Sequence, residues 1–113
     1  MAPSTIAHVD PVSYAFEDRL ILLDGLAIEL FAQFAQFAEG STRLPLVWLM
    51  VRFDERKDDK LRVHLGTGPA GGPFYSDDAR ALSALGQFDV PSTELPRLRE
   101  FFDEAARRAG RAA

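Results

Sequence analysis

Residues 93–109 constrain the fold most, because their apolar residues recur with the period of an α-helix. The apolar positions are Leu98, Phe101, Phe102, Ala105 and Ala109, and the charged positions between them are Arg99, Glu100, Asp103, Arg107 and Arg108. Thr93 or Ser92 can be the N-cap, and with Thr93 in that role Glu94 and Pro96 suit the first turn of a helix. The apolar face of this helix has to be buried, so the rest of the chain must supply a surface for it to cover.

Several segments before the helix carry the residue types of β-strands. Val12–Phe16 mixes β-branched and aromatic residues, and Gln87–Val90 can form a last strand before the helix. Leu44–Phe53 is apolar at successive positions, which is typical of a strand covered on both faces, and Pro45 is expected near its beginning or at an edge. Together these segments predict a mainly antiparallel sheet.

Residues 19–30 have the pattern of a β-hairpin. Two apolar runs flank Asp24-Gly25, a dipeptide that favours a two-residue turn. With the turn at these two residues, the cross-strand pairs are Leu23 with Leu26 and Ile21 with Ile28. This register places the four apolar side chains on one face of the sheet.

A helix over residues 26–39 is an alternative to the second half of this hairpin. Gly40 would end that helix, and Glu29, Gln33 and Gln36 would form one polar stripe at helical spacing. In an unbulged strand, by contrast, three phenylalanines at positions 31, 34 and 37 fall on alternating faces. The sequence leaves both structures open, as a bulged continuation of the hairpin or as a helix.

The middle of the chain predicts a second hairpin. Residues 55–60 form a charged turn, and Lys60–Leu65 then alternates strictly. The inward positions are Leu61, Val63 and Leu65, and the outward positions are Arg62 and His64. Residues 66–72 are rich in glycine and proline and predict a loop, residues 73–76 can pair as a short strand, and residues 77–86 carry no clear pattern.

These elements predict an α+β domain over residues 12–113, preceded by a flexible tail over residues 1–11. Antiparallel hairpins form a sheet or a partly open barrel, which the C-terminal helix closes. The quoted elements resemble the small bacterial pleckstrin-homology-like (PH-like) domains, including actinobacterial ones. The resembling segments are Asp18–Leu22 (DRLIL), Arg43–Val51 (RLPLVWLMV), Lys60–Gly66 (KLRVHLG) and the closing helix LREFFDEAARRAG. This resemblance implies a binding or scaffold module without an active site.

Composition narrows the class of protein further. The net charge is −4 and acidic residues dominate residues 1–42, which disfavours binding to nucleic acids. No apolar run approaches the length of a membrane span, and the N-terminus lacks the pattern of a signal peptide. The absence of cysteine fits a reducing cytosol, and eleven arginines against two lysines are common in GC-rich genomes such as those of actinobacteria. We therefore expect a cytoplasmic bacterial protein.

The residue pattern predicts no catalytic, metal or cofactor site. His8 and Asp10 could supply two metal ligands and Asp77-Asp78 others, but nothing in their spacing links them. No nucleophile motif accompanies the second histidine, His64. The paired carboxylates at residues 58–59 and 77–78 are adjacent in turns rather than opposed across a cleft. The expected protein is therefore not an enzyme.

Three kinds of binding surface remain as hypotheses. The leading one is an aromatic surface that binds a protein partner or a second copy of the chain, with Phe31, Phe34, Phe37, Trp48 and Tyr75 as candidate contacts. The second is a membrane-surface or anionic-ligand site formed by Arg56, Lys57, Lys60 and Arg62, although acidic residues interleave with these cations. The third is a small-molecule pocket inside the barrel.

Overall fold

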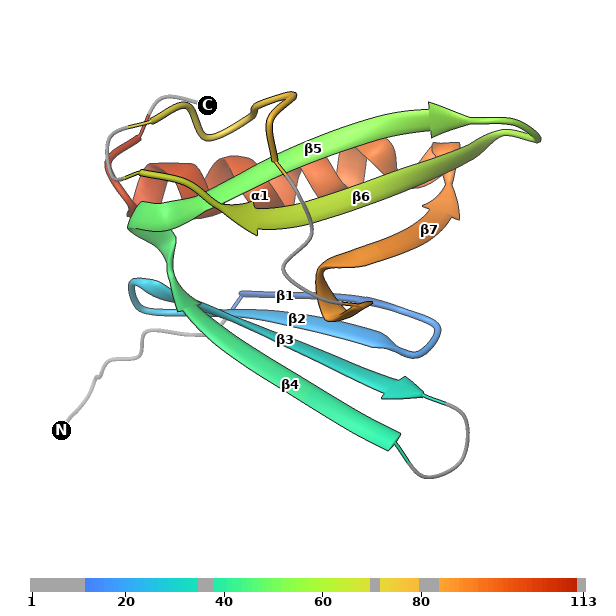
Figure 1. Cartoon of the computed structure of the whole chain (residues 1–113), viewed down its shortest axis with the longest axis horizontal. Coiled ribbons are helices and arrows are strands. Elements are labelled where there is room, and N and C mark those ends of the chain that lie inside the picture. The colour runs from blue at the N-terminus through green and yellow to red at the C-terminus, as the bar shows by residue number, and fades with distance from the viewer. Residues whose placement is uncertain (1–11, 35–37, 70–71, 80–83, 112–113) are drawn as a thin grey trace, which may run out of the picture.

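The computed structural model describes residues 12–34, 38–69, 72–79 and 84–111, which form two antiparallel sheets and one α-helix (Figure 1). The first sheet has the order β1 (Val12–Phe16), β2 (Arg19–Asp24), β3 (Ala27–Phe34) and β4 (Ala38–Pro45). The second has the order β5 (Leu49–Arg56), β6 (Lys60–Thr67) and β7 (Gln87–Pro91). Three 3-10 turns, η1 (Leu46–Trp48), η2 (Ala84–Gly86) and η3 (Ser92–Glu94), precede β5, β7 and helix α1 (Leu95–Arg108). The α+β class with a C-terminal helix is confirmed.

The β2–β3 hairpin forms as expected, but its register differs by two residues from the expected one. The turn residues are Gly25 and Leu26, so Leu23 pairs with Ile28 rather than with Leu26, and Ile21 pairs with Leu30. Gly25 has a φ of +63° at the first turn position, where a type II′ turn requires a positive φ. Asp24 stays in the strand, and Leu26 is moved from the expected inner face to the tip of the turn.

The alternative helix over residues 26–39 is wrong in the part that the structure describes, because β3 runs as a strand from Ala27 to Phe34. The expected single strand over residues 44–53 is wrong as well. Its first two residues end β4, its last five belong to β5, and η1 lies between them. Where the chain passes from one sheet to the other, Leu44, Leu46 and Leu49 are buried, whereas Val47 and Trp48 are exposed.

In the second hairpin, Leu61, Val63 and Leu65 are buried as expected, but His64 is only 7% exposed and does not face solvent. Its ring contacts Arg52 and Asp54 of β5, and the segment that follows β6 pairs with the other edge of β5. The amide N–H of Val51 donates to the carbonyl of Phe74 and that of Ser76 donates to the carbonyl of Val51, at 2.8 and 3.0 Å. The expected strand over residues 73–76 is thus reduced to one parallel bridge at Tyr75.

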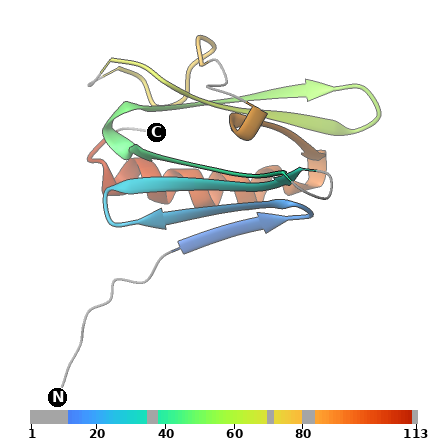
Figure 2. The ribbon, with the colours of Figure 1, turned by 60° about the horizontal axis from the view of Figure 1, so that its bottom comes forward.

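Helix α1 lies between the edge strands of the two sheets. The Phe101 ring packs on Tyr14 of β1 and the Phe102 ring on Phe53 of β5, with centroids 6.2 and 6.1 Å apart. The expected buried face is confirmed at Leu98, Phe101, Phe102 and Ala105, and Ala109 is partly buried. In Figure 2, α1 runs behind the strands of the first sheet and below the β5–β6 hairpin, and its buried residues belong to the same core as those of both sheets.

The start of α1 differs from the expected one. Thr93 is not the N-cap, because it lies inside η3, and the helix begins after Glu94 without a side-chain cap. Pro96 occupies the first turn, as expected. No helix in the described ranges is both long and apolar enough to cross a lipid bilayer.

Candidate interaction surface

Three large apolar side chains are exposed at one end of the molecule. Leu26 is 69% exposed, Trp48 46% and Val47 41%. Leu26 belongs to the β2–β3 turn and the other two to η1, and both views place this turn and the β4–β5 connection at the same end (Figures 1 and 2). We call these three residues the terminal apolar patch.

The backbone beneath the terminal apolar patch is held by hydrogen bonds on two sides. The amide N–H of Leu46 donates to the carbonyl of Leu26 at 2.9 Å, which joins η1 to the turn. The amide N–H of Gly68 donates to the carbonyl of Trp48, also at 2.9 Å. Leu46 itself is fully buried, so the 3-10 turn is anchored in the core while its next two side chains face solvent.

Arg111 fixes the same connection from behind. Its NH1 donates to the carbonyls of Leu46 and Leu49 at 3.0 and 2.5 Å, and its NH2 donates to the carbonyl of Gly72 at 2.8 Å. The guanidinium also lies over the ring of Phe74, 5.2 Å from its centroid. Burial lowers the pKa of Arg111, but an arginine remains charged near neutral pH. A single cation therefore ties both ends of η1 to the loop after β6.

Charged residues of both signs border the patch. A shallow groove lined by Asp24, Leu26, Ala27, Arg43, Leu44 and Pro45 begins at the turn. Arg43 NH1 lies 2.8 Å from Glu29 Oε1 and 3.5 Å from Asp24 Oδ2. Because the Arg43 and Asp24 side chains are both more than half exposed, their contact is weak and either can take another partner.

The other predicted aromatic contacts are distributed over different places. Phe31 is half-buried on the outer face of the first sheet, next to exposed Leu20 on β2. The Tyr75 hydroxyl donates to Asp103 Oδ1 at 2.7 Å, and its ring packs on Phe53 and Phe74. Tyr75 therefore joins the segment after β6 to α1. The side chain of Phe34 and all of Phe37 lie outside the described residues.

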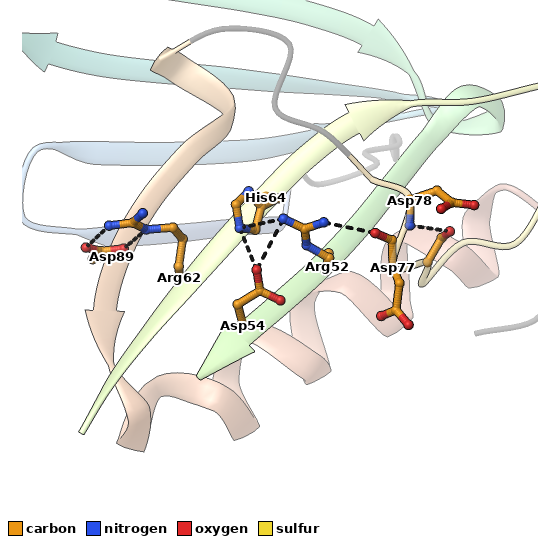
Figure 3. A network of polar contacts seen from close by, with 8 residues as sticks. Arg52, Asp54, Arg62, His64, Asp77, Asp78 and Asp89 are labelled. Carbon is orange, nitrogen blue, oxygen red and sulfur yellow. Dashed lines mark hydrogen bonds and ion pairs between the residues drawn. The ribbon is translucent and has the colours of Figure 1, made fainter. Parts of the chain in front are cut away.

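The predicted anion contacts lie on the β5–β6 hairpin. Arg56, Lys57 and Lys60 are exposed near its tip, together with the acidic Glu55, Asp58 and Asp59. Arg62 is occupied by Asp89 of β7, with Nε to Oδ1 at 2.7 Å and NH2 to Oδ2 at 3.1 Å (Figure 3). This bidentate pair raises the pKa of Arg62 and lowers that of Asp89. An anionic-ligand site on this hairpin stays a prediction that rests on three cations rather than four.

His64 belongs to a polar network that spans β5 and β6 (Figure 3). Its Nε2 lies 3.0 Å from Asp54 Oδ2 and 3.1 Å from Arg52 NH2, and Arg52 NH1 donates to the carbonyl of Asp77 at 2.9 Å. Desolvation, followed by the charge of Arg52, lowers the pKa of His64. At neutral pH the imidazole is therefore neutral, and its contact with Asp54 is a hydrogen bond rather than an ion pair.

This environment predicts that acid destabilises the fold through His64. The unfolded state takes up a proton near a pH of about 6.5, while the folded state resists until a lower pH. The contribution of neutral His64 to the free energy of unfolding is fully present above the unfolded-state pKa. It is lost as the pH falls toward the folded-state pKa, by about 1.4 kcal/mol for each pH unit between the two pKa values. Urea unfolding between about pH 7 and about pH 5 measures this loss.

The variant that tests the role of His64 is His64→Gln. We expect a smaller loss of stability toward low pH in His64→Gln, since the titrating ring is absent. A His64→Gln profile with the same slope as the wild type would show that His64 does not cause the acid sensitivity.

No group of three or more His, Asp or Glu side chains in the described ranges is placed to hold a metal ion. Comparisons with protein-family models, with curated proteins and with solved structures found no match. The resemblance to PH-like domains therefore stays a prediction.

Sequence reasoning found Trp48 but missed the rest of the terminal apolar patch. The sequence pattern places Leu26 on the inner face of the sheet. The only signal for its true position is Gly25, which favours a type II′ turn with Leu26 as the second turn residue. Val47 lies in an apolar run with no sign of the break at η1. Arg111 lies beyond the amphipathic pattern of the helix, so no periodicity points to its role.

Proposed function

We propose that this chain is a non-catalytic scaffold module that associates with a second copy of itself through the terminal apolar patch. The observation that carries the proposal is the exposure of Trp48, Val47 and Leu26 on a backbone that buried residues and Arg111 hold in place. Tryptophan is prominent among the side chains that dominate interface energies. A preorganised patch loses little conformational entropy on binding.

The charges beside the patch favour a second copy as the partner. Arg43 and Asp24 lie at the same border, and an isologous contact brings equivalent surfaces together around a two-fold axis. Arg43 of one copy can then pair with Asp24 of the other, so the border is complementary to itself. Three large apolar side chains form a small interface, which predicts a weak dimer with a Kd between about 1 µM and 1 mM.

Sedimentation velocity over a range of concentrations tests this proposal. We expect the wild type to shift from monomer to dimer, and Trp48→Ser or Leu26→Ser to raise the dimer Kd by about tenfold or more. Leu20→Ser is the matched control, because Leu20 is also exposed but lies on the outer face of the first sheet.

Two outcomes contradict the proposal. One is a wild-type chain that remains monomeric up to about 1 mM. The other is a dimer that Leu20→Ser weakens and Trp48→Ser does not, which moves the interface to the outer face of the sheet around Phe31. Circular dichroism of each variant verifies that it remains folded.

A further inference from the structure

Strand β1 is an edge strand whose outward backbone groups can be assigned from the register. Phe16 and Arg19 flank the two-residue turn between β1 and β2, so they form the hydrogen-bonded pair that closes it. Hydrogen-bonded and non-hydrogen-bonded pairs alternate along an antiparallel ladder. The N–H and C=O groups of Tyr14 therefore point toward β2, and those of Ser13 and Ala15 point toward the open edge.

In the described part of the chain, no strand pairs with that edge. Natural proteins commonly protect such an edge with a charged residue, a proline or a bulge. The sequence of β1 is VSYAF, which has neither charge nor proline, and its pairing with β2 runs from Val12 to Phe16 without a bulge. The edge is therefore competent to pair with another strand.

A groove of about 550 Å³ runs beside this edge. It is lined by Val12, Ser13 and Tyr14 of β1 and by Phe101 and charged residues of α1, which are Arg97, Glu100, Asp103, Glu104 and Arg107. Most of these charges have internal partners: Arg97 pairs with Glu94, Arg107 with Glu104, and Asp103 accepts the Tyr75 hydroxyl. For Glu100 the described residues provide no ion-pair partner, and its side chain is exposed in the groove wall.

We propose that the β1 edge binds an extended peptide segment of a partner protein by strand addition, with a lysine or arginine of that peptide placed against Glu100. The backbone groups of Ser13 and Ala15 supply main-chain hydrogen bonds, which give affinity without regard to sequence. Specificity comes from the groove, where apolar peptide side chains contact Val12 and Phe101 and the basic one neutralises Glu100.

The charges on α1 disfavour a second copy of this chain in the groove. Arg97 lies over the Tyr14 ring, 5.0 Å from its centroid, so a dimer paired through β1 with its two-fold axis near Tyr14 would bring Arg97 close to Arg97 of the second copy. Like charges meet in that arrangement, whereas a basic peptide meets an uncompensated carboxylate. The proposal is independent of self-association through the terminal apolar patch.

The test begins with selection from a phage-displayed library of random dodecapeptides on the wild-type chain, followed by affinity measurements with the selected peptides. Ala15→Pro is the decisive variant, because it removes an outward N–H and leaves every β1–β2 hydrogen bond in place. Ala15→Ser is its matched control, since it retains the N–H. We expect selected peptides to contain lysine or arginine, Ala15→Pro to weaken their binding at least about tenfold, and Ala15→Ser to bind as the wild type does.

Two further measurements keep the proposal testable if Ala15→Pro does not fold. Hydrogen exchange on the wild type should show the Ser13 and Ala15 amides becoming protected when peptide binds, and Glu100→Lys should abolish the preference for basic peptides. The proposal is overturned if no peptide is enriched, if the peptides bind Ala15→Pro as tightly as the wild type, or if the two amides stay unprotected. It is also overturned if Ala15→Pro abolishes a dimer and no peptide binds.

Discussion

Replacing Phe102 with alanine is expected to destabilise the chain by about 3–5 kcal/mol. The Phe102 side chain is fully buried, and its ring packs on Phe53 of β5 and on the neighbouring Phe101 at centroid distances of 6.1 and 5.1 Å. The loss is a large part of the roughly 5–15 kcal/mol that stabilises a typical domain. Urea unfolding followed by circular dichroism measures it.

Two further substitutions at Phe102 distinguish a role of this side chain in the core from a role in self-association. Phe102→Leu keeps most of the apolar volume and should lose less stability than Phe102→Ala. Phe102→Asp places a charge in the core and should prevent folding. If Phe102→Asp remained folded and lost self-association, the apolar face of α1 would be the interface and the terminal apolar patch would not.

Replacing Arg111 with methionine is expected to destabilise the chain by about 2–3 kcal/mol. Three carbonyl groups, of Leu46, Leu49 and Gly72, lose their common donor, and partly buried acceptors without partners are costly. Methionine retains the apolar stem but removes the guanidinium, so the loss reports on the three hydrogen bonds together with the contact between the guanidinium and the Phe74 ring. Thermal and urea unfolding measure it.

Arg107→Met is the matched control for Arg111→Met. Arg107 is on the exposed side of α1 and pairs only with Glu104 of the same helix in the described residues, so we expect little change in stability. In Arg111→Met the ordered position of η1 should also be lost, which increases exposure of Trp48 and shifts its fluorescence to longer wavelength. Equal stability of the two variants would show that Arg111 does not hold the β4–β5 connection.

The candidate surfaces were predictable to different degrees. Trp48 is one of the aromatic contacts predicted from the sequence, but its exposure depends on the 3-10 turn that interrupts Leu44–Phe53. Arg62 is a plausible anion contact in sequence, and only the pairing of β6 with β7 shows that Asp89 already binds it. Residues distant in the chain therefore decide whether Trp48 is exposed and whether Arg62 is available to an anion.

The sequence by itself determined the class of fold, because hairpin turns, strand alternation and helical periodicity are local properties. Val12–Phe16, Lys60–Leu65 and the buried face of α1 could be placed from patterns a few residues long. The tertiary structure alone decided where the chain changes sheets at η1, why His64 is buried, and which edge of β1 stays open. The position of η1 depends on Arg111, far along the chain, and the polar network of His64 extends through Arg52 to the carbonyl of Asp77. A periodic pattern in the sequence shows which residues are apolar, but the segments that pack against these residues determine which of them are buried and which are exposed to solvent.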